Sequence, residues 1–346
     1  MADGTPILEM RRASKIFGGG LFSSKRTVAL EDFSLSVNDQ PPSITAIVGE
    51  SGSGKTTLAR LILGLVAPTE GSVLYRGIDL RALSSAQRRQ FRRDVQVIFQ
   101  DPYEVYNPFY RVDHVLETPI KKFGLASSRT QARDMIEQAL HAVGLRPDET
   151  LGRYPHMLSG GQRQRVMVAR ALLIRPRVII ADEPVSMVDA SLRATILGSL
   201  RVLNQEHGIS LIYITHDLTT AYQISENIIV LYRGSVAEAG SVEHVVKEPK
   251  HPYTQLLVGS IPVPDPDHPW LGERAAKLEA TPQGCKFVSR CPEAISACLE
   301  ARPPFFQTEP RRVAACFLHQ DAPKLGYEDM ERVFVTDAPA SSTRSA

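Results

Sequence analysis

The sequence of 346 residues has few cysteines, almost no net charge and no long hydrophobic run. No window approaches the roughly eighteen uninterrupted apolar residues of a membrane-spanning helix, so we expect no segment that crosses a bilayer. The 40 Lys and Arg against 38 Asp and Glu leave a formal net charge of +2, which excludes bulk attraction to nucleic acid or anionic membranes. Residues 1–6 lack the basic and apolar regions of a secretory signal. These absences predict a cytosolic chain whose membrane contacts come through a partner.

The few cysteines lie together in the last fifth of the sequence, at Cys285, Cys291, Cys298 and Cys316. Disulfide bonds are rare in a reducing cytosol, which leaves metal binding or free thiols. The intervals of five, six and seventeen residues between them match neither zinc-finger nor ferredoxin spacing. The spacing by itself therefore favours ordinary thiols.

Hydrophobic patterns predict an α/β fold. Apolar runs typical of buried strands occur at residues 44–48, 178–181, 210–215 and 228–232, and no internal repeat is present. Residues 7–48 largely alternate apolar and polar positions, which indicates partly exposed strands. Apolar faces predict one helix that stops at Gly64 and another that ends at Gly144. Strands separated by helices favour a mostly parallel sheet covered on both faces.

A glycine-rich loop follows the strand predicted at residues 44–48. Its sequence, Gly-Glu-Ser-Gly-Ser-Gly-Lys-Thr, fits the P-loop pattern, in which backbone N–H groups and a helix N-terminus surround nucleotide phosphates. Lys55 is expected to reach the β- and γ-phosphates, and the Thr56 hydroxyl to bind Mg²⁺. The strand before and the helix after disfavour the alternative of a plain Gly/Ser-rich turn. The predicted ATP contacts of this loop are Gly49, Glu50, Ser51, Gly52, Ser53, Gly54, Lys55, Thr56 and Thr57.

Two adjacent carboxylates, Asp182 and Glu183, close the strand predicted at 178–181. They are therefore expected at the carboxyl edge of the sheet, where such folds bind ligands. Asp182 suits a water-mediated Mg²⁺ contact, and Glu183 is placed to polarise an attacking water. An exposed acidic turn before Pro184 is the alternative, which the P-loop disfavours.

A second phosphate-binding segment is predicted at Leu158–Gln162, which reads Leu-Ser-Gly-Gly-Gln. Ser159 and Gln162 fit the capping box of a helix over residues 162–173. Capping does not require Gly160 and Gly161, and two glycines before a helix N-terminus form an anion site. One chain with two half-sites suggests a dimer, in which the Ser159 helix of one subunit closes over nucleotide held by the P-loop of the other.

The P-loop, the Leu-Ser-Gly-Gly-Gln run and the Asp-Glu pair, in this order, resemble the ATP-binding cassette (ABC) ATPases that power membrane transporters. The resemblance implies that Gln100 contacts Mg²⁺ and links to the membrane subunit, and that His216 contacts the γ-phosphate. It implies that Asp189 acts from the partner subunit, although Met187 and Val188 replace the usual Ala-Leu before it. Phe17 falls where the family stacks an aromatic ring on adenine; a core aromatic is the alternative for this residue. Because neither Glu183 nor His216 is replaced, we expect a hydrolytically competent ATPase.

The C-terminal third is similar to the extension of oligopeptide, dipeptide and nickel importer ATPases. The similarity lies in His251–Leu257, Gly284–Phe287 and Arg290–Pro292. In some relatives the four matching cysteines hold a [4Fe–4S] cluster, which the resemblance makes a candidate cofactor here. The expected organisation is an ABC ATPase core (1–250) with an N-terminal antiparallel β part and a helical subdomain at about 101–165, an extension (251–335) and a flexible tail (336–346). Prolines near 249–270 predict a linker where the extension begins.

The resemblance implies the ATPase of a bacterial peptide importer. Its expected partners are a second ABC ATPase subunit (a paralogue or another copy), two membrane permease subunits and an extracytoplasmic solute-binding protein, with no nucleic acid. The chain is expected at the cytoplasmic face of the inner membrane, as a peripheral protein. Import of nickel or an oligosaccharide by the same machine is the close alternative. A soluble ABC ATPase outside transport and an iron–sulfur sensor are the alternatives from other classes.

Overall fold

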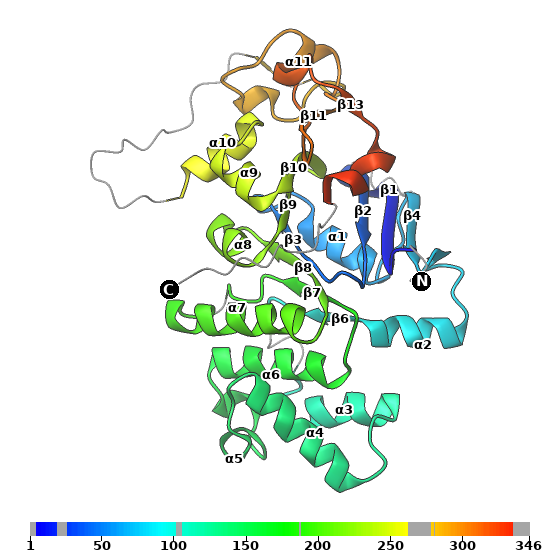
Figure 1. Cartoon of the computed structure of the whole chain (residues 1–346), viewed down its shortest axis with the longest axis vertical. Coiled ribbons are helices and arrows are strands. Elements are labelled where there is room, and N and C mark those ends of the chain that lie inside the picture. Colours follow the sequence, from blue (N-terminus) through cyan, green and yellow to red (C-terminus); the bar gives the residue numbers. More distant parts are fainter. Residues whose placement is uncertain are drawn as a thin grey trace. The chain divides into compact units, whose positions relative to one another are not determined.

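The computed structural model describes residues 5–18, 26–101, 106–186, 188–261, 278–279 and 281–334 (Figure 1). Pro102, Met187, residues 262–270 of the predicted linker and the predicted tail (336–346) lie outside the described residues. The chain forms two compact units, one made of Met1–Ala82 with Ile214–Ala346 and the other of Leu83–Tyr213. Within the described part, no helix has the length and the apolar character that a membrane span requires.

The first unit contains an antiparallel sheet near the N-terminus, with strand order β2-β1-β4-β5 (Figure 1). This arrangement confirms the strands predicted within residues 7–48 and the N-terminal antiparallel part. Exposure is mixed along its strands but does not alternate strictly. Leu8, Glu9 and Met10 of β1 are all buried and Arg11 and Arg12 are exposed, where the pairing of β1 with β2 shifts register. Its strands are β1 (Leu8–Phe17), β2 (Thr27–Val37), β4 (Glu70–Tyr75) and β5 (Ile78–Asp79).

A second group of strands in the first unit joins β3 and β9 to strands of the C-terminal residues. Their order is β13-β11-β12-β10-β9-β3, with β3 and β9 parallel and the other pairs antiparallel. Every residue of β3 and β9 is buried, as their continuous apolar sequences predict. The strands are β3 (Ile44–Val48), β9 (Asn227–Tyr232), β10 (Ser235–Ser241), β11 (Phe305–Glu309), β12 (Arg312–Ala314) and β13 (Lys324–Leu325).

The helices of the first unit are short, and two of them begin at side chains that cap them. Asp217 accepts the Thr219 N–H at 2.9 Å before α8, and His251 caps α10 in the same way. The helices are α1 (Lys55–Ile62), α8 (Leu218–Ile224), α9 (Val242–Lys247), α10 (Pro252–Gly259) and α11 (Ala297–Glu300), with 3₁₀ turns at Val288–Arg290, Phe317–His319 and Tyr327–Phe334. The described residues from 251 onward are called the C-terminal extension below.

The second unit combines short parallel strands with most of the long helices. Strands β6 and β7 pair in parallel, and β8 lies next to β7. Helix α6 packs against α3 and α4 (Figure 1), and its apolar residues are almost all buried. The elements are α2 (Ser85–Asp94), β6 (Val95–Ile98), α3 (Asp113–Phe123), α4 (Arg129–Ala142), α5 (Pro147–Thr150), a 3₁₀ turn (Pro155–Met157), α6 (Gly160–Leu173), β7 (Val178–Asp182), α7 (Ala190–Gln205) and β8 (Ser210–Thr215).

Candidate nucleotide site

The glycine-rich loop connects β3 directly to α1, as its sequence predicts. Gly54 is the residue before α1, with φ 107°, and provides no side chain to cap the helix. A Cβ atom at Gly49 would lie 2.2 Å from the Leu231 carbonyl oxygen, and one at Gly54 would lie 2.4 Å from the Ala29 carbonyl oxygen. Glycine at both positions lets the loop pass close to neighbouring backbone, and it leaves the N-terminus of α1 available to an anion.

Lys55 lies over the loop and is buried, with an exposed fraction of 7%. Its Nζ donates to the carbonyl oxygen of Gly49 at 2.6 Å and to that of Glu50 at 3.0 Å. The ammonium group is therefore held on the side of the loop, while the neighbouring Thr56 side chain is exposed. The buried Ser53 hydroxyl has no protein partner among the described residues, so it is a polar group that a bound phosphate could satisfy.

Two other predicted site residues of the first unit are exposed. Phe17 is at the end of β1 with 41% exposure, and the Lys15 ammonium lies 5.2 Å from its ring centroid. This exposure excludes the alternative of a core aromatic. His216 is exposed between β8 and α8, directly before the capping residue Asp217.

In the second unit, the structure joins Gln100 to Glu183. The Gln100 Nε2 donates to Glu183 Oε2 at 2.9 Å, across 83 residues of sequence. Glu183 has φ 44°, a left-handed conformation that is unfavourable for a residue with a side chain. Ser186 stabilises this turn, because its N–H and hydroxyl donate to the Glu183 carbonyl oxygen at 3.2 and 2.9 Å. Asp182 is the last residue of β7, so both carboxylates are at the carboxyl end of that strand.

The Leu-Ser-Gly-Gly-Gln segment starts α6 with the predicted capping box. Ser159 Oγ accepts the Gln162 N–H at 3.2 Å, and Gln162 Oε1 accepts the Ser159 N–H at 2.9 Å. The structure adds a steric reason for Gly161 that sequence reasoning missed. A Cβ atom there would lie 2.5 Å from Leu192 Cδ1 of α7, so the starts of the two helices approach closely. Asp189 caps α7 through the Leu192 N–H at 3.0 Å.

Sequence reasoning also missed the contacts of the C-terminal extension with the P-loop. Tyr253 accepts the Glu50 N–H at 2.9 Å, and Arg290 forms an ion pair with the Glu50 carboxylate at 2.9 Å. Both residues belong to segments that carried the resemblance, but no local pattern indicated which residue they would contact.

The four cysteines lie near one another in the C-terminal extension and are free thiols. Burial raises the pKa of Cys291 to about 11 and that of Cys316 to about 12, with smaller contributions from the other cysteines. Cys285 is tied to Cys298 by its N–H, which donates to the Cys298 carbonyl oxygen at 2.8 Å. Across the described residues, no group of three or more His, Cys, Asp or Glu side chains is arranged to hold a metal ion. The thiols as placed therefore do not fit a preformed metal site.

Two family models match the chain. The model for the ABC transporter matches residues 30–186, and the model for the oligopeptide/dipeptide transporter C-terminal region matches residues 237–298. The dimeric structure of a post-hydrolysis state of the ATP-binding cassette MJ0796 bound to ADP and Pi is 30% identical, with a TM-score of 0.60, covering 68% of this chain and 98% of that one. Fold and matches together define an ABC transporter ATPase, which confirms the predicted fold class and enzyme activity.

The most informative relatives are named as oligopeptide transport ATP-binding proteins. OppF of Haemophilus influenzae is 40% identical over 280 residues, which cover 78% of this chain and 83% of that one. OppF of Salmonella typhimurium is 41% identical over 267 residues, 74% of this chain and 78% of that one. YkfD of Bacillus subtilis is 41% identical over 323 residues, 92% of this chain and 97% of that one. The chain belongs to this family of transporter ATP-binding subunits.

Proposed function

We propose that this chain hydrolyses ATP to power the import of peptides through a membrane permease. The observation that carries the choice of cargo is the match of residues 237–298 to the oligopeptide/dipeptide transporter C-terminal region. The names of the relatives support the same cargo over nickel or an oligosaccharide. The full ABC core with a transporter-type extension disfavours a soluble ATPase outside transport and an iron–sulfur sensor.

The proposed ATP contacts on one subunit are the loop residues 49–57 together with Phe17. Lys55 would bind the β- and γ-phosphates, and His216 would contact the γ-phosphate. The closeness of α1 to the loop and the unpartnered Ser53 hydroxyl support phosphate binding there. Mg²⁺, when bound, neutralises phosphate charge; Thr56, Gln100 and Asp182 would hold it.

Glu183 is the proposed group that polarises the attacking water. Its hydrogen bond from Gln100 fixes the direction of the carboxylate, and its left-handed backbone conformation comes directly after the last residue of β7. General-base residues must be held in this way to act on a water in the right geometry. These observations support a hydrolytic role for Glu183.

We propose that the functional unit is a dimer of ABC ATPase subunits, in which Ser159, Gly160, Gly161, Gln162 and Asp189 contact the nucleotide of the partner subunit. The capped N-terminus of α6 supports this role, because helix N-termini favour anions. Two permease subunits and an extracytoplasmic binding protein would complete the machine. This assembly would place the chain at the cytoplasmic face of the inner membrane. The division into a core (1–250), an extension (251–335) and a tail stays a prediction.

A Lys55→Ala variant tests the nucleotide site. We expect it to lose ATP binding by at least about tenfold, because Lys55 supplies the side-chain cation of the loop and each lost charge-assisted hydrogen bond removes about 1.5–3 kcal/mol. Isothermal titration of the purified full chain with Mg-ATP measures the effect. Lys247→Ala is the matched control, since Lys247 is an exposed lysine paired with Glu243. Unchanged ATP affinity in Lys55→Ala would contradict the site.

The choice of cargo is tested on the extracytoplasmic binding protein (the receptor), because the specificity for cargo resides there. The extracytoplasmic binding protein encoded with this chain is expected to bind peptides and to stimulate ATP hydrolysis by the assembled transporter. Titration of the receptor with peptides, nickel and oligosaccharides separates the candidates. Binding of nickel or a sugar without peptide binding would refute the peptide proposal.

The [4Fe–4S] cluster stays a prediction from the resemblance, and no step of the proposed function depends on it. If the cluster is present, we expect protein prepared without oxygen to be brown. Its visible sulfur-to-iron absorption should then be lost in a Cys291→Ser variant. A colourless wild-type protein under these conditions would refute the cluster and agree with four free thiols.

A further inference from the structure

Glu50, the second residue of the P-loop, is held by contacts from three directions within the first unit. Its N–H donates to Tyr253 Oη at 2.9 Å. Its carboxylate accepts both terminal nitrogens of Arg290, with Nη1 to Oε2 at 2.9 Å and Nη2 to Oε1 at 3.0 Å. Its carbonyl oxygen accepts Lys55 Nζ at 3.0 Å. Backbone and side chain of one loop residue are therefore both bound by the C-terminal extension.

Arg290 is fixed in the orientation that this two-point ion pair needs. Its guanidinium lies 5.6 Å from the ring centroid of Phe287 and 5.9 Å from that of Tyr232, within the range of cation–π contacts. Phe287 in turn packs edge-on against Tyr232, with centroids 5.2 Å apart. A planar guanidinium held by rings and by a carboxylate has few alternative rotamers, so the pair is preorganised.

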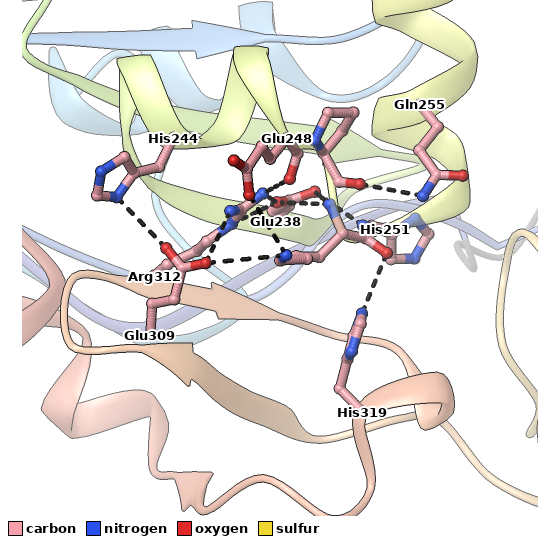
Figure 2. A network of polar contacts seen from close by, with 10 residues as sticks. Glu238, His244, Glu248, His251, Gln255, Glu309, Arg312 and His319 are labelled. Carbon is pink, nitrogen blue, oxygen red and sulfur yellow. Dashed lines mark hydrogen bonds and ion pairs between the residues drawn. The ribbon is translucent and has the colours of Figure 1, made fainter.

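Tyr253 is fixed still more tightly, because it is fully buried at the start of α10. His251 Nδ1 accepts the Tyr253 N–H at 3.0 Å, and burial lowers the pKa of His251 to about 3, which keeps the ring neutral and able to accept. The backbone N–H of His251 donates to the Glu238 carboxylate, and this carboxylate forms a buried ion pair with Arg312 of β12 (Figure 2). A continuous set of contacts thus links the sheet of the extension to the P-loop backbone.

The negative charge of Glu50 makes its ion pair with Arg290 important for nucleotide binding. A carboxylate on a loop that binds phosphates repels the triphosphate, and the Arg290 pair offsets that negative charge. The side chains of Glu50 and Arg290 are 38% and 26% exposed, so solvent screens part of the interaction. The pair nevertheless sets the local charge at the phosphate loop.

We infer that the C-terminal extension acts as a positioning element of the nucleotide site, in which Arg290 neutralises Glu50 and Tyr253 fixes its backbone. The inference rests on the proposed binding of ATP at residues 49–57. Arg290 and Tyr253 do not touch the nucleotide in this proposal; they act through Glu50. The extension, which the family resemblance connects only with the type of transporter, thereby determines how tightly the core binds ATP.

An Arg290→Met variant of the full chain tests the charge argument. Methionine keeps an unbranched apolar side chain against the rings but leaves Glu50 without its cation. We expect the Kd for Mg-ATP, measured by isothermal titration, to rise about three- to fivefold, as for a partly exposed ion pair. The Glu50→Gln/Arg290→Met double variant removes the unpaired charge and is expected to return the Kd to within about twofold of wild type. Higher salt should reduce the defect of the single variant.

Arg302→Ala is the matched control, because it removes a cation from the same extension. Its partner Glu31 keeps a second ion pair with Lys286 at 2.7 Å. We expect its ATP affinity to equal that of wild type. If Arg302→Ala weakened binding as Arg290→Met does, the effect would reflect general destabilisation of the extension, and the inference would fail.

Tyr253→Phe provides a second variant that removes one oxygen atom, in case Arg290→Met does not fold. We expect a higher KM for ATP with a much smaller change in kcat, since the loop loses an anchor and the hydrolytic residues are unchanged. Wild-type affinity in Arg290→Met and in Tyr253→Phe, or a weakened Arg290→Met that the second substitution does not rescue, would overturn the inference. Failure of the proposed ATP site is distinguishable, because Lys55→Ala would then also bind ATP normally.

Discussion

A Glu183→Gln variant is expected to lose ATP turnover by about 10²–10⁴-fold while it still dimerises in the presence of ATP. Glutamine keeps the size of the side chain and its hydrogen-bonding capacity toward Gln100 after an amide rotation, but it cannot take a proton from water. Gln100 holds the Glu183 carboxylate at 2.9 Å, and the backbone turn at φ 44° fixes the residue after β7. We therefore expect no other group in the described part of the unit to take over its role as the base. Phosphate release measures turnover, and size-exclusion chromatography with ATP measures dimerisation.

Glu206→Gln makes the same chemical change at an exposed position just after α7 and is expected to hydrolyse ATP as wild type does. The two outcomes that matter are separable. Full turnover in Glu183→Gln would remove this residue from the catalytic role. Loss of ATP-dependent dimers from the same variant, with turnover lost as well, would instead indicate that the substitution damages assembly.

An Arg312→Met variant is expected to lower the free energy of unfolding by about 3–5 kcal/mol, because it leaves a buried carboxylate unpaired. Arg312 and Glu238 are both 0% exposed, and Arg312 Nη2 donates to Glu238 Oε1 at 2.9 Å (Figure 2). Glu238 also accepts the N–H groups of Lys250 and His251 at 3.1 and 2.9 Å. Thermal unfolding of the full chain, followed by calorimetry, measures the loss.

The control for this prediction is Lys247→Ala, which breaks an ion pair whose side chains are 59% and 60% exposed. Exposed pairs are screened by solvent and contribute little to stability, so a small shift in Tm is expected. A Glu238→Gln/Arg312→Met double variant is expected to recover part of the stability, since glutamine is neutral and still accepts backbone N–H groups. Equal losses in Arg312→Met and Lys247→Ala would show that burial of the pair has no energetic effect.

Local sequence patterns predicted the framework of the nucleotide site well, because each signal lies within a few residues. The buried strand at 44–48 and the strand at 210–215 have the predicted bounds. The capping box at Ser159 and Gln162 is formed as its four-residue pattern indicates. The exposure of Phe17 could not be predicted, because a terminal aromatic in a strand can face either side.

Contacts between distant segments were beyond the reach of these patterns. Arg290 and Glu50 are 240 residues apart in the sequence, and Tyr253 and Glu50 are 203 apart. No local sequence pattern indicates which residue an arginine or a tyrosine hydroxyl will contact. The contacts with Glu50 depend on how the extension folds back onto the sheet, where β12 pairs with β10. The cysteines show the same limit, since their spacing says little about how close the thiols lie.

The narrow approach at Gly161 constrains how the chain can vary. The nearest atoms to an added methyl group there are Leu192 Cδ1 at 2.5 Å and Val188 Cγ1 at 3.6 Å, on either side of the capping residue Asp189. A larger side chain at position 161 would require the Leu192 side chain to move aside or to be replaced by a smaller one. Substitutions in the glycine pair and in the segment around Asp189 are therefore best designed together.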